Sequence, residues 1–295
     1  MVYRLQKALI PPLFLVLFSF NCGILSAQQP CFLSQPIPDA APDKNIPLVR
    51  WIYGISFGMY IPSNSTANYY NGSGEHSVEN ALNRQWNYDR IVRHLDEVIE
   101  NFWVYELPAN MKYNPALQVG FYGGLNLSNS FAVLGEFNYT RLTLADRFTI
   151  ATDRETFTSE PYLVLSDISG TEERIELRLG FQYTMLTNGY MHPFIESGLN
   201  ITDVKVIENR VNIKGLTINI REFRGEYYNI RDYGMGFGIY TGIGLKMDVS
   251  DAVAIRTGAS VSFSRINLGD NHEIMPQFTA FLRLNLNDVF APAAD

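Results

Sequence analysis

Seven charged residues of this chain lie in segments where apolar residues alternate with small or polar ones. A period of two places alternate side chains on opposite faces of a β-strand, so these charges share the face opposite the apolar one. Because an isolated charge in a low-dielectric interior is costly, charges of both signs on one enclosed face are expected to pair. If the strands close into a barrel, the pattern predicts a polar lumen filled by salt bridges. The alternative is a narrow, gated conduit through that barrel. The predicted network comprises Glu136, Glu176, Arg178, Glu196, Lys246, Arg256 and Arg283.

Residues suited to catalysis or metal binding are sparse. None of the four histidines, His76, His94, His192 and His272, forms a His-x-Ser or Asp-His pair at the end of a predicted strand. Covalent and general-base catalysis need such positioned partners. No Cys/His cluster indicates a metal, and no Gly-rich strand-to-helix turn indicates a nucleotide. We therefore expect no catalytic residue, metal or cofactor. An enzyme is a weaker hypothesis than a structural or surface-interaction protein, and weaker than a small porin.

Two long connections hold the other candidate residues. In 62–115, apolar residues at helical spacing predict an amphipathic helix over 88–102, which could cap the barrel, plug it or dock on a partner. A cap is favoured, because an amphipathic face needs burial. In 202–232, arginines alternate with aromatic residues, a combination that suits carbohydrate, lipid-phosphate or protein contacts. The candidate contact residues of the two connections are Trp86, Tyr88, Trp103, Tyr105, Arg221, Arg224, Tyr227 and Tyr228.

Eight alternating segments must position all these residues. The fold expected from them is all-β, a closed antiparallel up-and-down transmembrane barrel of eight strands, with ten as the alternative. Long connections at 62–115, 143–173 and 202–232 alternate with short ones, as extracellular loops alternate with periplasmic turns in such barrels. The predicted strands are 51–61, 116–126, 131–142, 174–185, 193–201, 233–247, 252–263 and 276–285.

The two ends of the chain predict export. Arg4 and Lys7 precede an apolar run and a Leu25-Ser26-Ala27 cleavage site, which predicts a signal peptide over 1–27. We expect a proline-rich periplasmic tail over 28–50, the barrel over 51–287 and a short tail over 288–295. The expected location is the outer membrane.

Composition supports this location. The formal net charge of −7 argues against a nucleic-acid partner. Aromatic residues at 13% with charged residues at only 18% suit a surface that meets lipid. After cleavage only Cys31 would remain, so an intramolecular disulfide is not expected.

Three stretches carry a resemblance to a known family: VGFYGGLN at 119–126, PFIESGLN at 193–200 and GFGIYTGIG at 236–244. With these, 51–285 resembles the small outer-membrane β-barrels of the OmpA/OmpX-like, porin-family type of Gram-negative bacteria. Gln28 after the cleavage site and the long first loop are similar to barrel proteins of Bacteroidetes. The chain departs from the family in having only 288–295 where OmpA-group proteins carry a periplasmic domain, and in lacking a terminal aromatic residue.

The resemblance implies an architecture and a lipid setting rather than an activity. Expected partners are outer-membrane lipid and lipopolysaccharide, with a protein partner at the extracellular loops. The leading hypothesis is a non-enzymatic structural or surface-interaction component. Its alternative is a small porin or an accessory subunit of a transport or secretion assembly.

Overall fold

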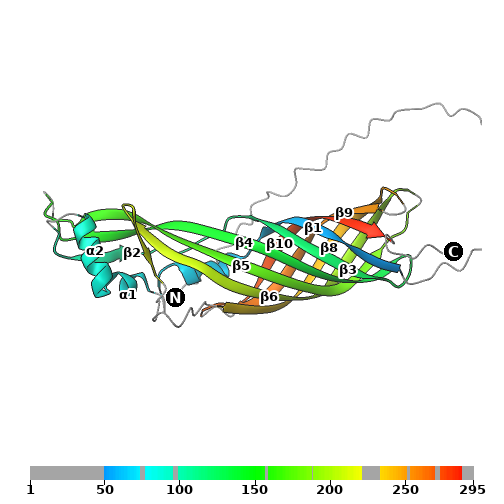
Figure 1. Ribbon diagram of the computed structural model, residues 1–295, viewed down its shortest axis with the longest axis horizontal. Coiled ribbons are helices and arrows are strands. Elements are labelled where there is room, and N and C mark those ends of the chain that lie inside the picture. The colour runs from blue at the N-terminus through cyan, green and yellow to red at the C-terminus, as the bar shows by residue number, and fades with distance from the viewer. Residues whose placement is uncertain are drawn as a thin grey trace, which may run out of the picture. The chain divides into compact units, whose positions relative to one another are not determined.

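Eight antiparallel strands form a closed ring in the computed structural model, which describes residues 50–73, 77–95, 99–156, 159–187, 189–220, 233–250, 253–269 and 273–287 (Figure 1). Pairing of the first strand with the last closes the ring, and the eight-stranded prediction is confirmed. In ring order the strands are β1 (Arg50–Ile61), β3 (Ala116–Asn126), β4 (Phe131–Thr152), β5 (Tyr162–Thr184), β6 (Met191–Ile213), β8 (Tyr233–Asp248), β9 (Val253–Asn267) and β10 (Ile274–Asn287). The predicted signal peptide, nearly all of the proline-rich tail and the 288–295 tail lie outside the described residues.

Alternation produces an apolar belt around this ring. In β5, Leu177, Leu179 and Phe181 point outward and are 40%, 56% and 57% exposed, whereas Arg178 between them is buried. A closed ring leaves no unpaired strand edge, which is what a sheet needs to lie in lipid. The ring and its belt are those of a transmembrane barrel.

Three strands, β4, β5 and β6, continue well beyond the segments predicted for them, at the end with the long connections. We call this the outer end and the opposite one the inner end. Above Thr140 of β4 the inner face changes from polar to apolar, at Leu142 and Leu144, and the outer face becomes polar, at Arg141 and Thr143. The period of two is unbroken, but the polarity inverts because water has replaced lipid outside.

Two short strands widen this extension. β2 (Phe102–Glu106) pairs with β4, and β7 (Leu216–Asn219) pairs with β6. We call the sheet formed by 141–152, 162–173, 203–219 and β2 the wall.

The described parts of the first long connection other than β2 pack on the inner face of the wall, and we call residues 62–115 without β2 the cap. It contains η1 (Asn64–Tyr70), α1 (Val78–Leu82) and α2 (Gln85–Leu95), which lie at the outer end in Figure 1. One apolar core joins cap and wall; it includes Val78, Leu82, Ile91, Leu95, Ile150, Val164, Ile168, Val211 and Ile218.

The helix predicted over 88–102 differs in its bounds. It begins at Gln85 and ends at Leu95, and Phe102 already belongs to β2, where it pairs with Thr152. The apolar spacing of Ile99 and Phe102 fits a helix, but the free edge of β4 offers this backbone a ladder of hydrogen bonds instead.

Candidate functional site

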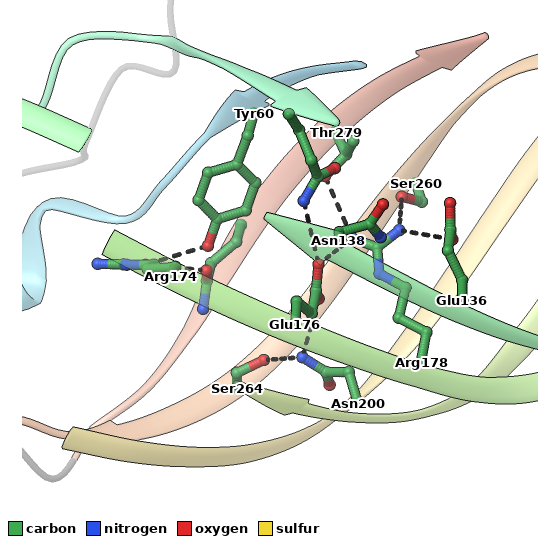
Figure 2. A network of polar contacts seen from close by, with 12 residues as sticks. Tyr60, Glu136, Asn138, Arg174, Glu176, Arg178, Asn200, Ser260, Ser264 and Thr279 are labelled. Atoms are coloured by element: carbon green, nitrogen blue, oxygen red, sulfur yellow. Dashed lines mark hydrogen bonds and ion pairs between the residues drawn. The ribbon is translucent and has the colours of Figure 1, made fainter. Parts of the chain in front are cut away.

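Arg283 holds two glutamates at the centre of the barrel lumen. Its guanidinium donates to Glu136 Oε2 at 2.8 Å and to Glu196 Oε2 at 2.6 Å, from a strand far from both in sequence. Arg178 forms a second ion pair with Glu176 at 2.9 Å and lies 4.0 Å from Glu136 (Figure 2). All five side chains are buried, and the two guanidinium groups compensate two of the three carboxylate charges out of water.

Neutral polar groups complete these contacts. Arg178 donates to Ser260 and Thr279, each at 3.2 Å, and Asn200 donates to Glu176 at 3.2 Å and to Ser264 at 2.7 Å (Figure 2). Such bonds offset the cost of taking the ions out of water.

Arg256 and Lys246 behave differently from the other predicted network residues. Arg256 is buried in the lumen and donates to Gln182 Oε1 at 2.9 Å, and among the described residues no carboxylate lies within ion-pair distance of it. Lys246 is not in the network: it pairs with Asp248 at 2.9 Å, with about a quarter of its side chain exposed. It sits near the inner end of β8, where solvent reaches the strand.

Aromatic rings fill the space between the charges. The Arg283 guanidinium lies 4.0 Å from the Phe281 ring centroid, and Arg178 lies 5.3 Å from that of Tyr240. A Cβ added to Gly258 would lie 2.8 Å from the Phe281 ring. The absence of a side chain at Gly258 therefore makes room for this ring, and the lumen at this level is close-packed.

A second buried cluster ties the cap to the outer mouth of the barrel. Glu172 Oε2 accepts hydrogen bonds from the Tyr70 hydroxyl at 2.8 Å and the Tyr113 hydroxyl at 2.9 Å, while Glu172 Oε1 pairs with Arg174 at 2.7 Å. Arg174 also donates to Thr66 at 2.9 Å. Burial and the neighbouring Glu172 carboxylate raise the pKa of Tyr70 and of Tyr113 well above the usual value.

Sequence reasoning placed both ionic partners of this cluster outside the network. Glu172 fell in the predicted connection 143–173, and Arg174 was the first residue of the next predicted strand. The structure puts a β-bulge between Thr171 and Glu172, which shifts the register there. The available signal was the charged run itself, Glu172-Glu173-Arg174, next to a predicted strand.

The predicted contact aromatics separate into two kinds. Trp86, Trp103 and Tyr105 are 57%, 44% and 58% exposed. Tyr88 instead packs between cap and wall: its ring stacks on Phe102 of β2 at 4.8 Å, and its hydroxyl donates to the Glu100 carbonyl at 2.9 Å. The other four candidates, Arg221, Arg224, Tyr227 and Tyr228, lie outside the described residues.

Trp103 and Tyr105 belong to a larger apolar patch on the outward face of the wall. Register places Trp103 beside Ala151 and Ala151 beside Leu163, while Leu165 lies opposite Thr149. Leu163 and Leu165 are 48% and 58% exposed. We call Trp103, Tyr105, Leu163 and Leu165 the wall patch.

One histidine has partners that its sequence neighbours did not indicate. His192 Nε2 lies 3.4 Å from Asp248, and its Nδ1 lies 3.3 Å from the Thr187 hydroxyl, because β6 and β8 bring the two chain segments together. The Thr187 hydroxyl donates instead to the Met191 carbonyl at 2.6 Å, and the Thr187 backbone N–H donates to Nδ1 at 3.2 Å. The arrangement braces a turn and does not activate a nucleophile.

The described residues offer neither a metal site nor a membrane-spanning helix. They contain no group of three or more His, Cys, Asp or Glu side chains placed to hold a metal ion. None of their helices is long and apolar enough to cross a membrane.

Solved structures similar to this chain are small outer-membrane barrels. Neisserial surface protein A matches with 7% identity and a TM-score of 0.40, over 81% of this chain and 96% of that one. Ail, the attachment invasion locus protein of Yersinia pestis, matches with 12% identity and a TM-score of 0.33, over 81% and 97%. The outer membrane protein OprG of Pseudomonas aeruginosa matches with 8% identity and a TM-score of 0.35, over 81% and 92%.

Comparisons of sequence give no relative. No family model and no curated protein matches this chain. The class follows from the ring, its lipid-facing belt and its polar lumen: this is an outer-membrane β-barrel protein, built with a cap and a wall at its outer end.

Proposed function

We propose that this protein is a non-enzymatic component of the cell surface that binds a protein partner through its wall patch. In this proposal a signal peptide over 1–27 directs export, the long-loop end is extracellular, and lipopolysaccharide surrounds the barrel. The close-packed lumen supports a structural role for the ion network.

The wall patch is the observation that carries the proposal. Charged residues on the outward face, Arg141, Arg147, Asp167 and Glu173, separate it from the apolar belt, so it faces water rather than lipid. Large apolar side chains grouped on a water-facing surface mark interaction sites in soluble proteins. Tryptophan and tyrosine are also the residues most enriched in the energetic centres of interfaces.

Site-specific photocrosslinking in intact cells tests the proposal. A photoreactive phenylalanine analogue at Trp103 should give one discrete protein adduct, and the same analogue at Phe181 in the lipid-facing belt should not. The substitutions Leu163→Ser and Leu165→Ser, made together, should remove the adduct while the barrel remains folded. Equal adduct patterns at positions 103 and 181 would refute the proposal.

The cap itself cannot be deleted for this test. Residues 66–108 contain Tyr70 and most of the cap side of the shared core, so their removal would expose the inner face of the wall. The same deletion would remove Trp103 and Tyr105 of the wall patch. Substitutions on the outward face leave that core intact.

A further inference from the structure

The cap has an open hollow of about 450 Å³ between η1 and the segment that leads into β3. Five of its six lining residues are polar, and Asn64, Asn68, Asn110 and Lys112 among them are exposed to solvent. The sixth, Met111, is 1% exposed, and carbon atoms contribute more of the lining surface than polar atoms do. The hollow is separate from the lumen network and from the wall patch. The lining residues are Asn64, Ser65, Asn68, Asn110, Met111 and Lys112.

The polar residues of this lining include side-chain amides that can bond to hydroxyl groups. A side-chain amide both donates and accepts hydrogen bonds, which matches the alternating donors and acceptors of a sugar ring. Within the described residues the side chains of Asn68, Asn110 and Lys112 make no hydrogen bond or ion pair of their own. No carboxylate lines the hollow, and the Lys112 ammonium is its single charge.

Buried contacts hold the two sides of the hollow in place. Asn64 Oδ1 accepts from the Tyr113 backbone N–H at 3.2 Å, and the hydroxyls of Thr66 and Tyr113 lie 3.1 Å apart. Tyr113 is in turn anchored on Glu172 at the barrel mouth. A site fixed before its ligand arrives avoids part of the ordering cost of binding.

We propose that this hollow binds a small saccharide that carries one acidic group. The amides of Asn68 and Asn110 would bond its hydroxyls, and Lys112 would pair with its carboxylate. A long polyanion is disfavoured, because the chain as a whole has a net charge of −7. The inference rests on the proposed function only in that the outer end faces the cell exterior.

Saturation-transfer NMR and calorimetry on the full mature chain in lipid nanodiscs test the proposal, with 3′-sialyllactose and lactose as probes. Sialyllactose should bind saturably and about threefold to tenfold more tightly than lactose at low salt, and the preference should shrink at high salt. Asn68→Ala and Asn110→Ala should each weaken binding of both sugars about fivefold. Lys112→Gln should abolish the preference for the acidic sugar.

Matched controls are Asn129→Ala, in a short turn at the inner end, and Lys214→Gln, in the turn between β6 and β7; both should bind as the wild type does. Absence of saturable binding by either sugar would overturn the proposal. Wild-type binding by the Asn68→Ala, Asn110→Ala double variant would overturn it as well. The crosslinking result at Trp103 is independent, so either proposal can fail alone.

Discussion

At the scale of single residues, Arg283 is the side chain on which the lumen depends most. It neutralises Glu136 and Glu196 together, and all three are almost fully buried. Arg283→Met would leave both carboxylates without this partner, and breaking a buried ion pair typically costs about 3–5 kcal/mol of unfolding free energy. Urea unfolding in detergent micelles measures this loss.

The matched control is Arg147→Met. Arg147 pairs with Asp167 at 3.9 Å, with both side chains about two-thirds exposed, and we expect a change below about 1 kcal/mol. Equal losses for the two variants would show that the lumen network does not stabilise the barrel.

Most of this network was predictable residue by residue. Alternation along the strand was enough to assign Glu136, Glu176 and Arg178 to the lumen. Once the apolar residues of a strand are known to face outward, the residues between them must point inward. Alternation does not show how far a residue lies from the ends of the barrel. It therefore grouped Lys246 with residues far from solvent. The pairing of Arg283 with Glu136 depends on barrel stagger, which no local pattern encodes.

At the scale of elements, two tyrosine hydroxyls strengthen the contact that the shared apolar core makes between the cap and the rest of the barrel. The pKa of Tyr70 and of Tyr113 is raised in the folded protein, so above about pH 10 the unfolded chain loses protons that the folded chain keeps. Their contribution to stability is therefore complete below pH 10 and declines as pH rises further. We expect the cap to open in this range. The fluorescence of Trp86 and Trp103, measured as a function of pH, tests this.

Replacing both tyrosines by phenylalanine should reduce that decline. The double variant should also be less stable at pH 8, by about 1–3 kcal/mol for each lost bond to buried Glu172. Tyr190→Phe, at an 84% exposed position, is the control and should follow the wild type. A pH profile unchanged in the double variant would contradict this assignment.

The predicted strands that are shorter than β4, β5 and β6 are too short for one common reason. Expected strands ended where apolar residues left the outward face, near Tyr139 and Ile201. Beyond these points the alternation continues, but apolar residues now face inward and polar residues face outward, as in a water-soluble sheet. A pattern that requires apolar residues on the outward face therefore predicts a loop there. In β6 the apolar residues at 204, 206, 211 and 213 are buried in this way, and the strand reaches Ile213.

At the scale of the whole molecule, the filled lumen predicts that the protein does not conduct ions. An eight-stranded barrel has an interior just wide enough for side chains, and here rings and ion pairs occupy it. Planar-bilayer recordings of the purified wild type should show no stable channels. Steady conductance that changes with Glu136→Gln or Arg178→Gln would instead support the small-porin alternative.

The position of the cap in the sequence, before the strands on which it packs, also affects how the protein folds. The cap precedes β4, β5 and β6 in sequence, yet its apolar helix faces have nowhere to pack until those strands have formed. Contacts between distant segments form slowly, and β1 must wait longer still for β10. We expect the newly exported chain to travel with the cap unfolded and its apolar surface open. Holdase chaperones, which bind such surfaces, would then be needed by this protein more than by a barrel with short loops.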